Sequence, residues 1–389
     1  GSYENPDANR KAFFETTKQQ LTELIRQQYN RPSICFWGLQ NEVLAFEECM
    51  PEFMSELNAL AHAEDPTRLT TQATDKDAAN GWETDLLAWN SYPGWYFGTK
   101  DDMGSYFDGK HAADSRPIAV SEYGAGANIE HHVDVATDAD KNIGKFQAEE
   151  YQSLCHESII RQINERPYLW ATYVWNMFDF SCDWRSEGGL QGINTKGLVS
   201  RDRTVKKDAF YLYKANWSSE PVAYIAGRRN DVRKNALNQI KVYSNCESVE
   251  LSVNGKVISR LTQDDLAQRT VFIFEDVPLA TGENTVAVKA VKNGSTYTDS
   301  VIWEKVVGTG TDIKSDTLVV DSRRKAIELN GKYTAEEFLG LIVSASNAAF
   351  KLYEADGKTE VTSGPVSAGM VLIVTSEDGS NTAVYSILN

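Results

Sequence analysis

The chain has 389 residues, of which 41% are hydrophobic and 24% are charged. This composition is typical of folded domains and argues against intrinsic disorder, and the length predicts about two to four domains. The 55 acidic residues outnumber the 39 basic ones and give a formal net charge of −16, which disfavours nucleic acid and anionic membrane surfaces as partners. No apolar run reaches the roughly 18 residues that a membrane span needs.

The cysteines and histidines do not form a pattern that points to a metal site. Five cysteines are scattered without a C-x-x-C pair, which argues against a disulfide scaffold and a structural zinc site. They are Cys35, Cys49, Cys155, Cys182 and Cys246. The adjacent pair His131 and His132 is expected in a solvated loop, because neighbouring positions rarely point at one ion. The residues therefore indicate no metal ligand.

From about residue 8 to residue 217, helical and strand patterns alternate along the chain. Apolar residues at helical spacing predict a helix that ends near residues 29–30 and is followed by a buried strand. The predicted strands lie at 33–37, 68–71, 86–90, 117–121 and 171–175, and further helices at 50–63 and 145–164. This rhythm of strand, helix and strand predicts βαβ units around a parallel sheet.

After Trp217 the pattern changes to short alternating runs that are separated by turn signals such as Asn254-Gly255 and Asn293-Gly294. Such runs predict an antiparallel, immunoglobulin-like β-sandwich over residues 218–307. A linker rich in Gly and Thr then precedes a small β-rich domain over 311–389 with one helix at 335–341.

Two glutamates stand directly after predicted buried strands. Glu42 follows the strand at 33–37, and Glu122 follows the strand at 117–121. Residues just past the carboxyl ends of parallel strands face the catalytic mouth of α/β folds. Two carboxylates in such positions can hydrolyse glycosides, one as an acid and the other as a nucleophile or base. The residues alone leave open that both glutamates are merely solvated.

Five segments in order carry a family resemblance. The segment Asn-Arg-Pro-Ser-Ile-Cys-Phe-Trp-Gly-Leu-Gln-Asn-Glu at 30–42 resembles the acid/base signature of glycoside hydrolase family 2, which includes β-galactosidases, β-glucuronidases and β-mannosidases. Segments 90–96, 118–124, 173–180 and 192–217 resemble later motifs of the same family. The resemblance covers about residues 1–305.

The resemblance implies a fold that is α/β plus all-β. Residues 1–217 would form a (β/α)8 TIM barrel domain that carries strands four to eight and lacks the first three. The immunoglobulin-like sandwich and the small β-rich domain would follow it. Such a barrel leaves open strand edges that favour pairing with other chains. A homo-oligomer is therefore compatible, and the prediction of activity applies to the parent enzyme and is not made for this chain alone.

The resemblance also implies the roles of individual residues. Glu42 would be the acid/base and Glu122 the nucleophile, while Tyr92 would hydrogen-bond Glu122. The expected substrate-binding residues are Asn41, Asn90, Tyr92, Trp95, Trp175 and Lys196. Simple packing is an equal alternative for Trp95. No metal ligand and no required cofactor follow, although relatives allow Mg²⁺ or Na⁺ near the site.

The segment Asn194-Thr195-Lys196 is ambiguous between two substrates and a structural role. The pattern Asn194-x-Lys196 resembles the pair that binds the carboxylate in β-glucuronidases, but β-galactosidase-like sequences carry it too, so a structural role stays open. We expect a retaining exo-β-glycosidase acting on terminal β-galactosides, with a β-glucuronidase using Lys196 as one alternative and a non-catalytic glycan-binding fragment as another. Family habit implies a periplasmic, extracellular or cell-surface location. The partner is expected to be a carbohydrate.

Overall fold

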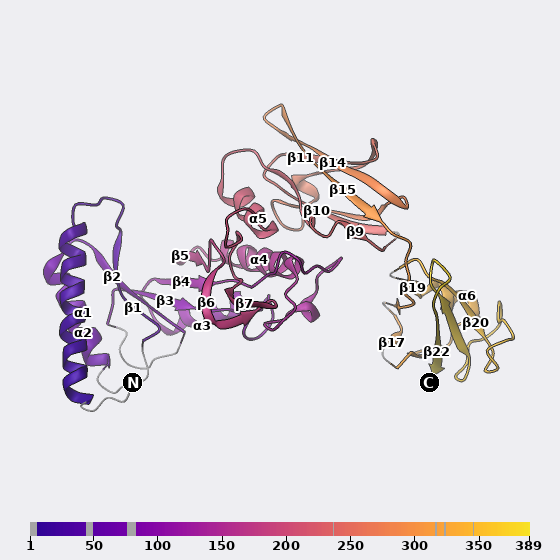
Figure 1. Cartoon of the computed structure of the whole chain (residues 1–389), viewed down its shortest axis with the longest axis horizontal. Helices are drawn as coiled ribbons and strands as arrows, with labels where there is room; N and C mark the ends of the chain where they lie inside the picture. Colours follow the sequence, from indigo (N-terminus) through magenta and orange to yellow (C-terminus); the bar gives the residue numbers. More distant parts are fainter. Residues whose placement is uncertain are drawn as a thin grey trace. The chain divides into compact units, whose positions relative to one another are not determined.

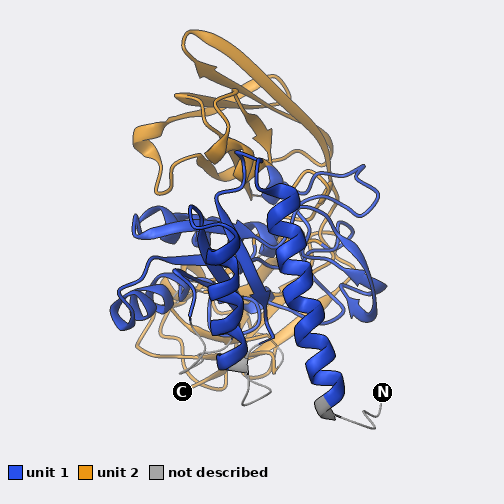
Figure 2. Ribbon diagram, turned by 90° about the vertical axis from the view of Figure 1, so that its left-hand side faces the viewer, with its two compact units in different colours: residues 1–131, 136–210 blue, residues 132–135, 211–389 orange. Residues whose placement is uncertain are grey.

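The computed structural model describes residues 6–43, 50–75, 83–235, 237–315, 317–322, 324–344 and 346–389. The chain divides into two compact units, which Figure 2 colours separately. Unit 1 comprises residues 1–131 and 136–210, and unit 2 comprises residues 132–135 and 211–389. Four of the cysteines are free thiols, and Cys49 lies outside the described residues.

Unit 1 is built on a parallel sheet whose five strands are neighbours in the order of the sequence. The strands are β1 (Phe36–Asn41), β2 (Leu69–Thr74), β3 (Leu86–Asn90), β4 (Ile118–Tyr123) and β5 (Leu169–Val174). β3 is buried along its whole length, whereas β1 is partly exposed. Sequential parallel neighbours are the arrangement of a TIM barrel. That they are barrel strands four to eight stays a prediction.

Helices flank the strands, as Figure 1 shows for α1 and α2 beside β1 and β2. The helices of this unit are α1 (Pro6–Gln28), α2 (Met50–Glu64), α3 (Met103–Ala113) and α4 (Glu149–Asn164), with a short 3-10 turn at Asp138–Asp140. α1 and α2 pack together through stacked rings of Phe14 and Phe53 and through the buried Leu21, Ile25 and Leu57. The predicted helices over 50–63 and 145–164 are thus present, the second shortened at its start.

The strand predicted at 33–37 begins later and runs to Asn41. Residues before it form a turn in which the Ile34 N–H donates to the Arg31 carbonyl oxygen at 3.2 Å. Its apolar residues therefore belong partly to the turn, and the strand continues through the polar Gln40 and Asn41. This continuation brings the end of the strand directly to Glu42.

A hairpin follows the parallel sheet and is absent from the sequence predictions. Its strands are β6 (Phe180–Glu187) and β7 (Leu190–Asn194). Gly188 and Gly189 form the turn with φ of 57° and 75°, a region that side chains other than glycine rarely adopt. The helix α5 (Asp208–Trp217) comes next.

The first β-rich region of unit 2 consists of two sheets that share one apolar core. The sheets have the orders β13-β10-β8 and β12-β11-β14-β15-β9. Their strands are β8 (Ala223–Ile225), β9 (Val232–Arg233), β10 (Leu237–Ser244), β11 (Ser248–Val253), β12 (Lys256–Thr262), β13 (Val271–Pro278), β14 (Gly282–Lys292) and β15 (Ser295–Lys305), with a 3-10 turn at Gln263–Asp265. Phe272 from one sheet and Trp303 from the other are fully buried in this core. The immunoglobulin-like topology and the boundaries at 217 and 307 stay predictions.

A second core lies in the C-terminal part of unit 2. It packs the capped helix α6 (Ala335–Gly340) against a mixed sheet of order β17-β18-β22-β21-β20. The same part of the chain also forms a separate two-stranded sheet, β16-β19. The strands are β16 (Ile313–Lys314), β17 (Val319–Asp321), β18 (Ala326–Glu328), β19 (Val343–Ser344), β20 (Ala349–Tyr353), β21 (Val371–Thr375) and β22 (Thr382–Leu388). This observation agrees with the predicted small β-rich region with one helix.

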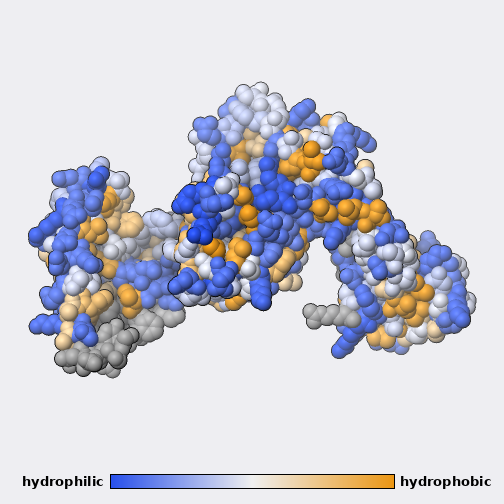
Figure 3. Space-filling view, viewed as in Figure 1, coloured by the Kyte–Doolittle hydropathy of each residue, from blue (hydrophilic) through white to orange (hydrophobic). Residues whose placement is uncertain are grey.

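Figure 3 shows hydrophilic side chains over most of the face in view, with smaller apolar areas between them. Within the described ranges, no helix combines the length and apolar character needed to cross a membrane.

Candidate active site

One pocket of about 410 Å³ lies at the carboxyl ends of the parallel strands of unit 1. Every one of these strands contributes at or just past its end. The contributions are Asn41 and Glu42 from β1, Asp75 from β2, Tyr92 from β3, Glu122 from β4 and Trp175 from β5. The rest of the wall consists of Tyr96, Phe180, Cys182, Trp184, Arg185, Asn194 and Lys196. The strand-end rule therefore brings Glu42 and Glu122 into the same cavity.

An amide group fixes the carboxylate of Glu42. The Asn90 Nδ2 donates to Glu42 Oε1 at 2.8 Å and to Asn41 Oδ1 at 2.9 Å. The Asn90 Oδ1 in turn accepts from Ser121 Oγ at 2.7 Å, which fixes which way the amide faces. Glu42 has a left-handed φ of 55°, and its N–H donates to the Ala73 carbonyl oxygen at 3.0 Å. Asn90 is buried and does not line the pocket, so it contacts Glu42 and Asn41 from behind.

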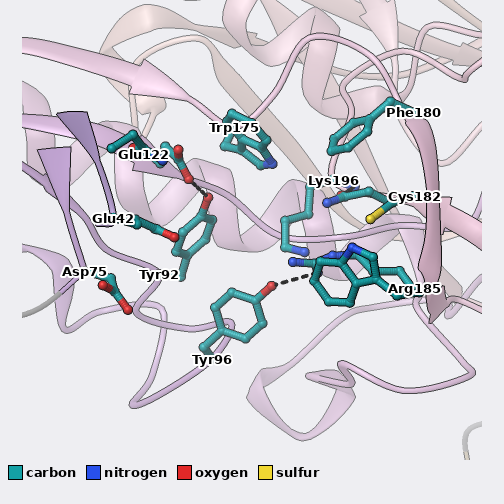
Figure 4. Close-up of a pocket in the computed structure, with 13 residues that line it drawn as sticks. Glu42, Asp75, Tyr92, Tyr96, Glu122, Trp175, Phe180, Cys182, Arg185 and Lys196 are labelled. Carbon is teal, nitrogen blue, oxygen red and sulfur yellow. Dashed lines mark hydrogen bonds between the residues drawn. The ribbon is translucent and has the colours of Figure 1, made fainter. Parts of the chain in front are cut away.

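Glu122 lies deeper and accepts a short hydrogen bond. The Tyr92 hydroxyl donates to Glu122 Oε2 at 2.6 Å, as Figure 4 shows. Burial raises the pKa of Glu122, and the charge of Glu42 raises it further, whereas the Tyr92 hydroxyl and the Lys196 ammonium oppose the rise. Burial and the neighbouring carboxylates also raise the pKa of Tyr92, which keeps its proton. Tyr92 therefore remains a protonated hydroxyl that donates to Glu122.

The two tryptophans expected at the site take different places. Trp175 lines the pocket, forms a cis peptide bond to Asn176 and contacts Phe180 edge to face at a centroid distance of 5.9 Å. Trp95 is only 1% exposed and is not among the described lining residues. The packing alternative therefore describes Trp95 better, because a buried ring offers no face to a ligand.

Lys196 reaches the pocket from the segment after β7. Its side chain is 1% exposed, and its ammonium lies 5.1 Å from the centre of the Tyr96 ring and 5.9 Å from that of Trp95. The Nζ atom pairs with Glu187 Oε2 at 3.2 Å. The Asn194 Oδ1 accepts from the Lys196 N–H at 3.1 Å, so the Asn-x-Lys pattern is a local turn that aims the lysine.

A buried ion pair holds this segment in place. The Lys207 Nζ donates to Asp179 Oδ1 at 2.9 Å and to the carbonyl oxygens of Thr195 at 2.9 Å and Ala127 at 2.8 Å. Asp179 Oδ1 also accepts from the Gly197 N–H at 2.8 Å. A Cβ on Gly197 would lie 2.0 Å from the Asp179 backbone nitrogen, so only glycine allows this approach. Burial raises the pKa of Asp179, and the Lys207 charge opposes that rise.

Several lining residues were not predicted. Asp75 follows the strand β2 as Glu42 follows β1, so the same strand-end signal could have found it. Tyr96, Cys182, Trp184 and Arg185 lie on loops and on the hairpin, where the sequence carries no such signal. In the ranges that the structure describes, no three metal-ligating side chains of the His, Cys, Asp and Glu type come together.

Comparison with known proteins decides the family. The family model described as "Glycosyl hydrolases family 2, TIM barrel domain" matches residues 2–220. The chain belongs to glycoside hydrolase family 2. A second model, described as a domain of unknown function, matches residues 236–298.

This family-2 chain is similar to curated proteins and to proteins of known structure. A β-glucuronidase of Bacteroides fragilis is 43% identical over 279 residues, which are 71% of this chain and 40% of that protein. The crystal structure of an FMN-binding β-glucuronidase from Faecalibacterium prausnitzii L2-6 is 39% identical with a TM-score of 0.69, over 75% of this chain and 44% of the other. A Bacteroides uniformis β-glucuronidase shares the fold over 99% of this chain and 42% of its own, at 24% identity and a TM-score of 0.68. The chain thus spans less than half the length of these relatives.

The buried ion pair gives a stability prediction with a defined pH dependence. Lys207→Met should lower the free energy of unfolding by about 3–5 kcal/mol, because it leaves Asp179 buried without its counter-charge. The folded-state pKa of Asp179 would then lie even further above its unfolded value. Stability is therefore kept at low pH, where Asp179 is protonated, and is lost as the pH rises through the folded-state pKa. Urea denaturation at about pH 5 and about pH 8 measures the difference.

The double variant Lys207→Met with Asp179→Asn is the control, since it removes the titrating group and should show no added loss at the higher pH. Equal destabilisation of Lys207→Met at both pH values would contradict the prediction.

Proposed function

We propose that this protein is a retaining β-glucuronidase. The observation that carries the proposal is the Lys196 ammonium at the wall of a pocket that also holds Glu42 and Glu122. Relatives at 43% and 39% identity are named β-glucuronidases, which supports the glucuronide alternative over the β-galactoside that the sequence first suggested.

The charge of the pocket supports an acidic sugar. A galactoside is neutral, and its C6 hydroxyl would leave the partly desolvated ammonium of Lys196 without a new counter-charge. A glucuronide carries a carboxylate at this carbon, and a charge-assisted hydrogen bond to it is about twice as strong as a neutral one. Lys196 already pairs with Glu187, so it favours glucuronides through the added attraction between its ammonium and the sugar carboxylate.

The first chemical step uses both glutamates. The ionised Glu122 attacks the anomeric carbon while Glu42 donates its proton to the leaving oxygen, so a glycosyl ester forms and the leaving group departs as a neutral alcohol. The Tyr92 hydroxyl stabilises the ionised nucleophile. Asn90 positions Glu42 through the bond at 2.8 Å.

The second step reverses the role of Glu42. Its carboxylate takes a proton from water, the water oxygen attacks the anomeric carbon, and the ester bond to Glu122 breaks. Asn41 lies beside Glu42 and is placed to hydrogen-bond the sugar 2-OH, an interaction that strengthens in the transition state. Trp175 offers its ring to the apolar face of the sugar.

Covalent labelling tests the assignment of the nucleophile. A 2-deoxy-2-fluoro-glucuronosyl fluoride should add one glycosyl group to the protein, because the fluorine at C2 slows breakdown of the ester. Glu122→Gln should abolish the added mass, measured by intact-protein mass spectrometry. Glu42→Gln is the matched control and should still be labelled, since fluoride leaves without an acid. Label on Glu122→Gln would refute the assignment, and an unlabelled native protein would favour the non-catalytic alternative.

Substrate preference tests the role of Lys196. Lys196→Ala should lower kcat/KM on p-nitrophenyl β-D-glucuronide by about 100-fold while changing activity on the matching galactoside and glucoside by less than about threefold. The reason is that only the glucuronide carries a carboxylate for the lysine. Equal losses on all three glycosides would indicate a structural lysine instead.

The hydrogen bond between Tyr92 and Glu122 predicts a change in pH dependence. Because the hydroxyl lowers the pKa of Glu122, Tyr92→Phe should raise that pKa and move the acidic limb of kcat/KM to higher pH. In Tyr92→Phe, kcat/KM should fall about tenfold more at pH values below this acidic limb than at pH values above it. Tyr96→Phe removes a hydroxyl that pairs with Arg185 and should leave the limb in place. An unchanged limb in Tyr92→Phe would contradict the prediction.

A further inference from the structure

A second cation lies next to Lys196 in the same pocket. Arg185 extends from β6 of the hairpin, and its Nη1 donates to the Tyr96 hydroxyl oxygen at 3.2 Å. In Figure 4 the guanidinium of Arg185 and the ammonium of Lys196 point toward each other in the cavity. Trp184 packs against the same guanidinium at 4.6 Å from its ring centre. Arg185 is thus ordered by groups on two sides while it faces the pocket.

One carboxylate serves both cations. Glu187 Oε1 accepts from Arg185 Nη1 and also lies 3.4 Å from Lys196 Nζ. Among the described residues, Glu187 is the carboxylate bonded to either cation, and it is not among those that line the pocket. Two positive charges therefore share one negative charge that contacts them from outside the cavity, and the cluster has a net positive charge.

The opposite side of the pocket is anionic. In Figure 4, Glu42 and Asp75 lie on the left, whereas Lys196 and Arg185 lie on the right. The leaving oxygen on C1 must lie beside Glu42, the proposed acid. In a β-glucuronide, the leaving oxygen on C1 and the carboxylate on C5 are equatorial groups that diverge from the two sides of the ring oxygen. A sugar with its leaving oxygen beside Glu42 can therefore direct its carboxylate toward the cations. An added anion at that place would balance the cluster.

We propose that Arg185 is a further specificity-determining residue and that it binds the substrate carboxylate together with Lys196. The proposal rests on the proposed glucuronidase function. A planar guanidinium presents parallel N–H donors that match the two oxygens of a carboxylate, which an ammonium cannot do. The hairpin β6–β7, which supplies Arg185 and Glu187, is then a recognition element in addition to the Asn194-x-Lys196 segment.

Paired substrates test the role of Arg185. The p-nitrophenyl β-D-glucuronide and β-D-glucoside differ only in the carboxylate that replaces the C6 hydroxymethyl group. Arg185→Gln should lower kcat/KM on the glucuronide about 30-fold, which is about 2 kcal/mol at 1.36 kcal/mol per tenfold change. Its kcat/KM on the glucoside should change less than about twofold. Arg185→Lys keeps the charge without the planar donors and should recover part of the loss.

Arg201→Gln is the matched control, because Arg201 is an exposed arginine of the same unit that does not line this pocket. It should leave both substrates unaffected. The double variant of Arg185→Gln with Lys196→Ala should lose less than the product of the single losses, since both residues bind one carboxylate. Binding of methyl β-D-glucuronide to the Glu122→Gln protein can be measured by calorimetry without turnover. Added Arg185→Gln or Lys196→Ala should weaken this binding, and the two together should weaken it most.

The outcomes separate the two proposals. A native protein that does not prefer the glucuronide over the glucoside would overturn the proposed function and this inference with it. A native preference that Lys196→Ala removes and Arg185→Gln keeps would overturn this inference alone. Equal losses on both substrates in Arg185→Gln would also overturn it, because a merely structural arginine would affect them alike.

Discussion

The buried ammonium of Lys207 donates to Asp179 and to the carbonyl oxygens of Thr195 and Ala127. Because a buried charge without partners is expensive, this arrangement fixes the chain segments that supply the acceptors. Thr195 stands between Asn194 and Lys196, so the position of the pocket lysine depends on a cation that never contacts the pocket. The close approach of Gly197 to Asp179 completes the constraint. The parallel sheet sets the other side of the pocket, and this ion pair sets the side that faces it.

The two sides of the pocket carry opposite charges, and their roles differ. Glu42 and Glu122 are held by neutral donors, Asn90 and Tyr92, which orient the carboxylates and add no charge. A cation in direct contact with Glu122 would hold the carboxylate ionised but would also weaken it as a nucleophile. On the other side, ring faces and a shared glutamate surround the cations. Under the proposed mechanism, this separation of the charges would allow reactivity and recognition to be set independently.

The sequence alone predicts those features that depend on the order of neighbouring residues along the chain. Polar residues at the ends of apolar runs predicted Glu42 and Glu122, and the strands of one parallel sheet then place their ends together. The prediction was less successful where tertiary packing decides. Trp95 and Trp175 look alike in sequence, and only the packing around each determines that one ring is buried and the other lines the pocket. Arg185 lies in a short hairpin of mixed polarity, so no hydrophobic periodicity in the sequence distinguishes it as a pocket residue.

Under the proposed glucuronidase function, binding of the substrate carboxylate by Lys196 and Arg185 would have a kinetic consequence. In a glucuronide the carboxylate does not take part in bond making or breaking, so it is the same group in the substrate, the glycosyl ester and the released sugar. Contacts to such a group stabilise ground state and transition state alike, which lowers KM but does not raise kcat. Under the proposed function, released glucuronate would keep the same contacts and compete for the pocket. A site that selects its sugar in this way trades turnover at high product concentration for discrimination among substrates.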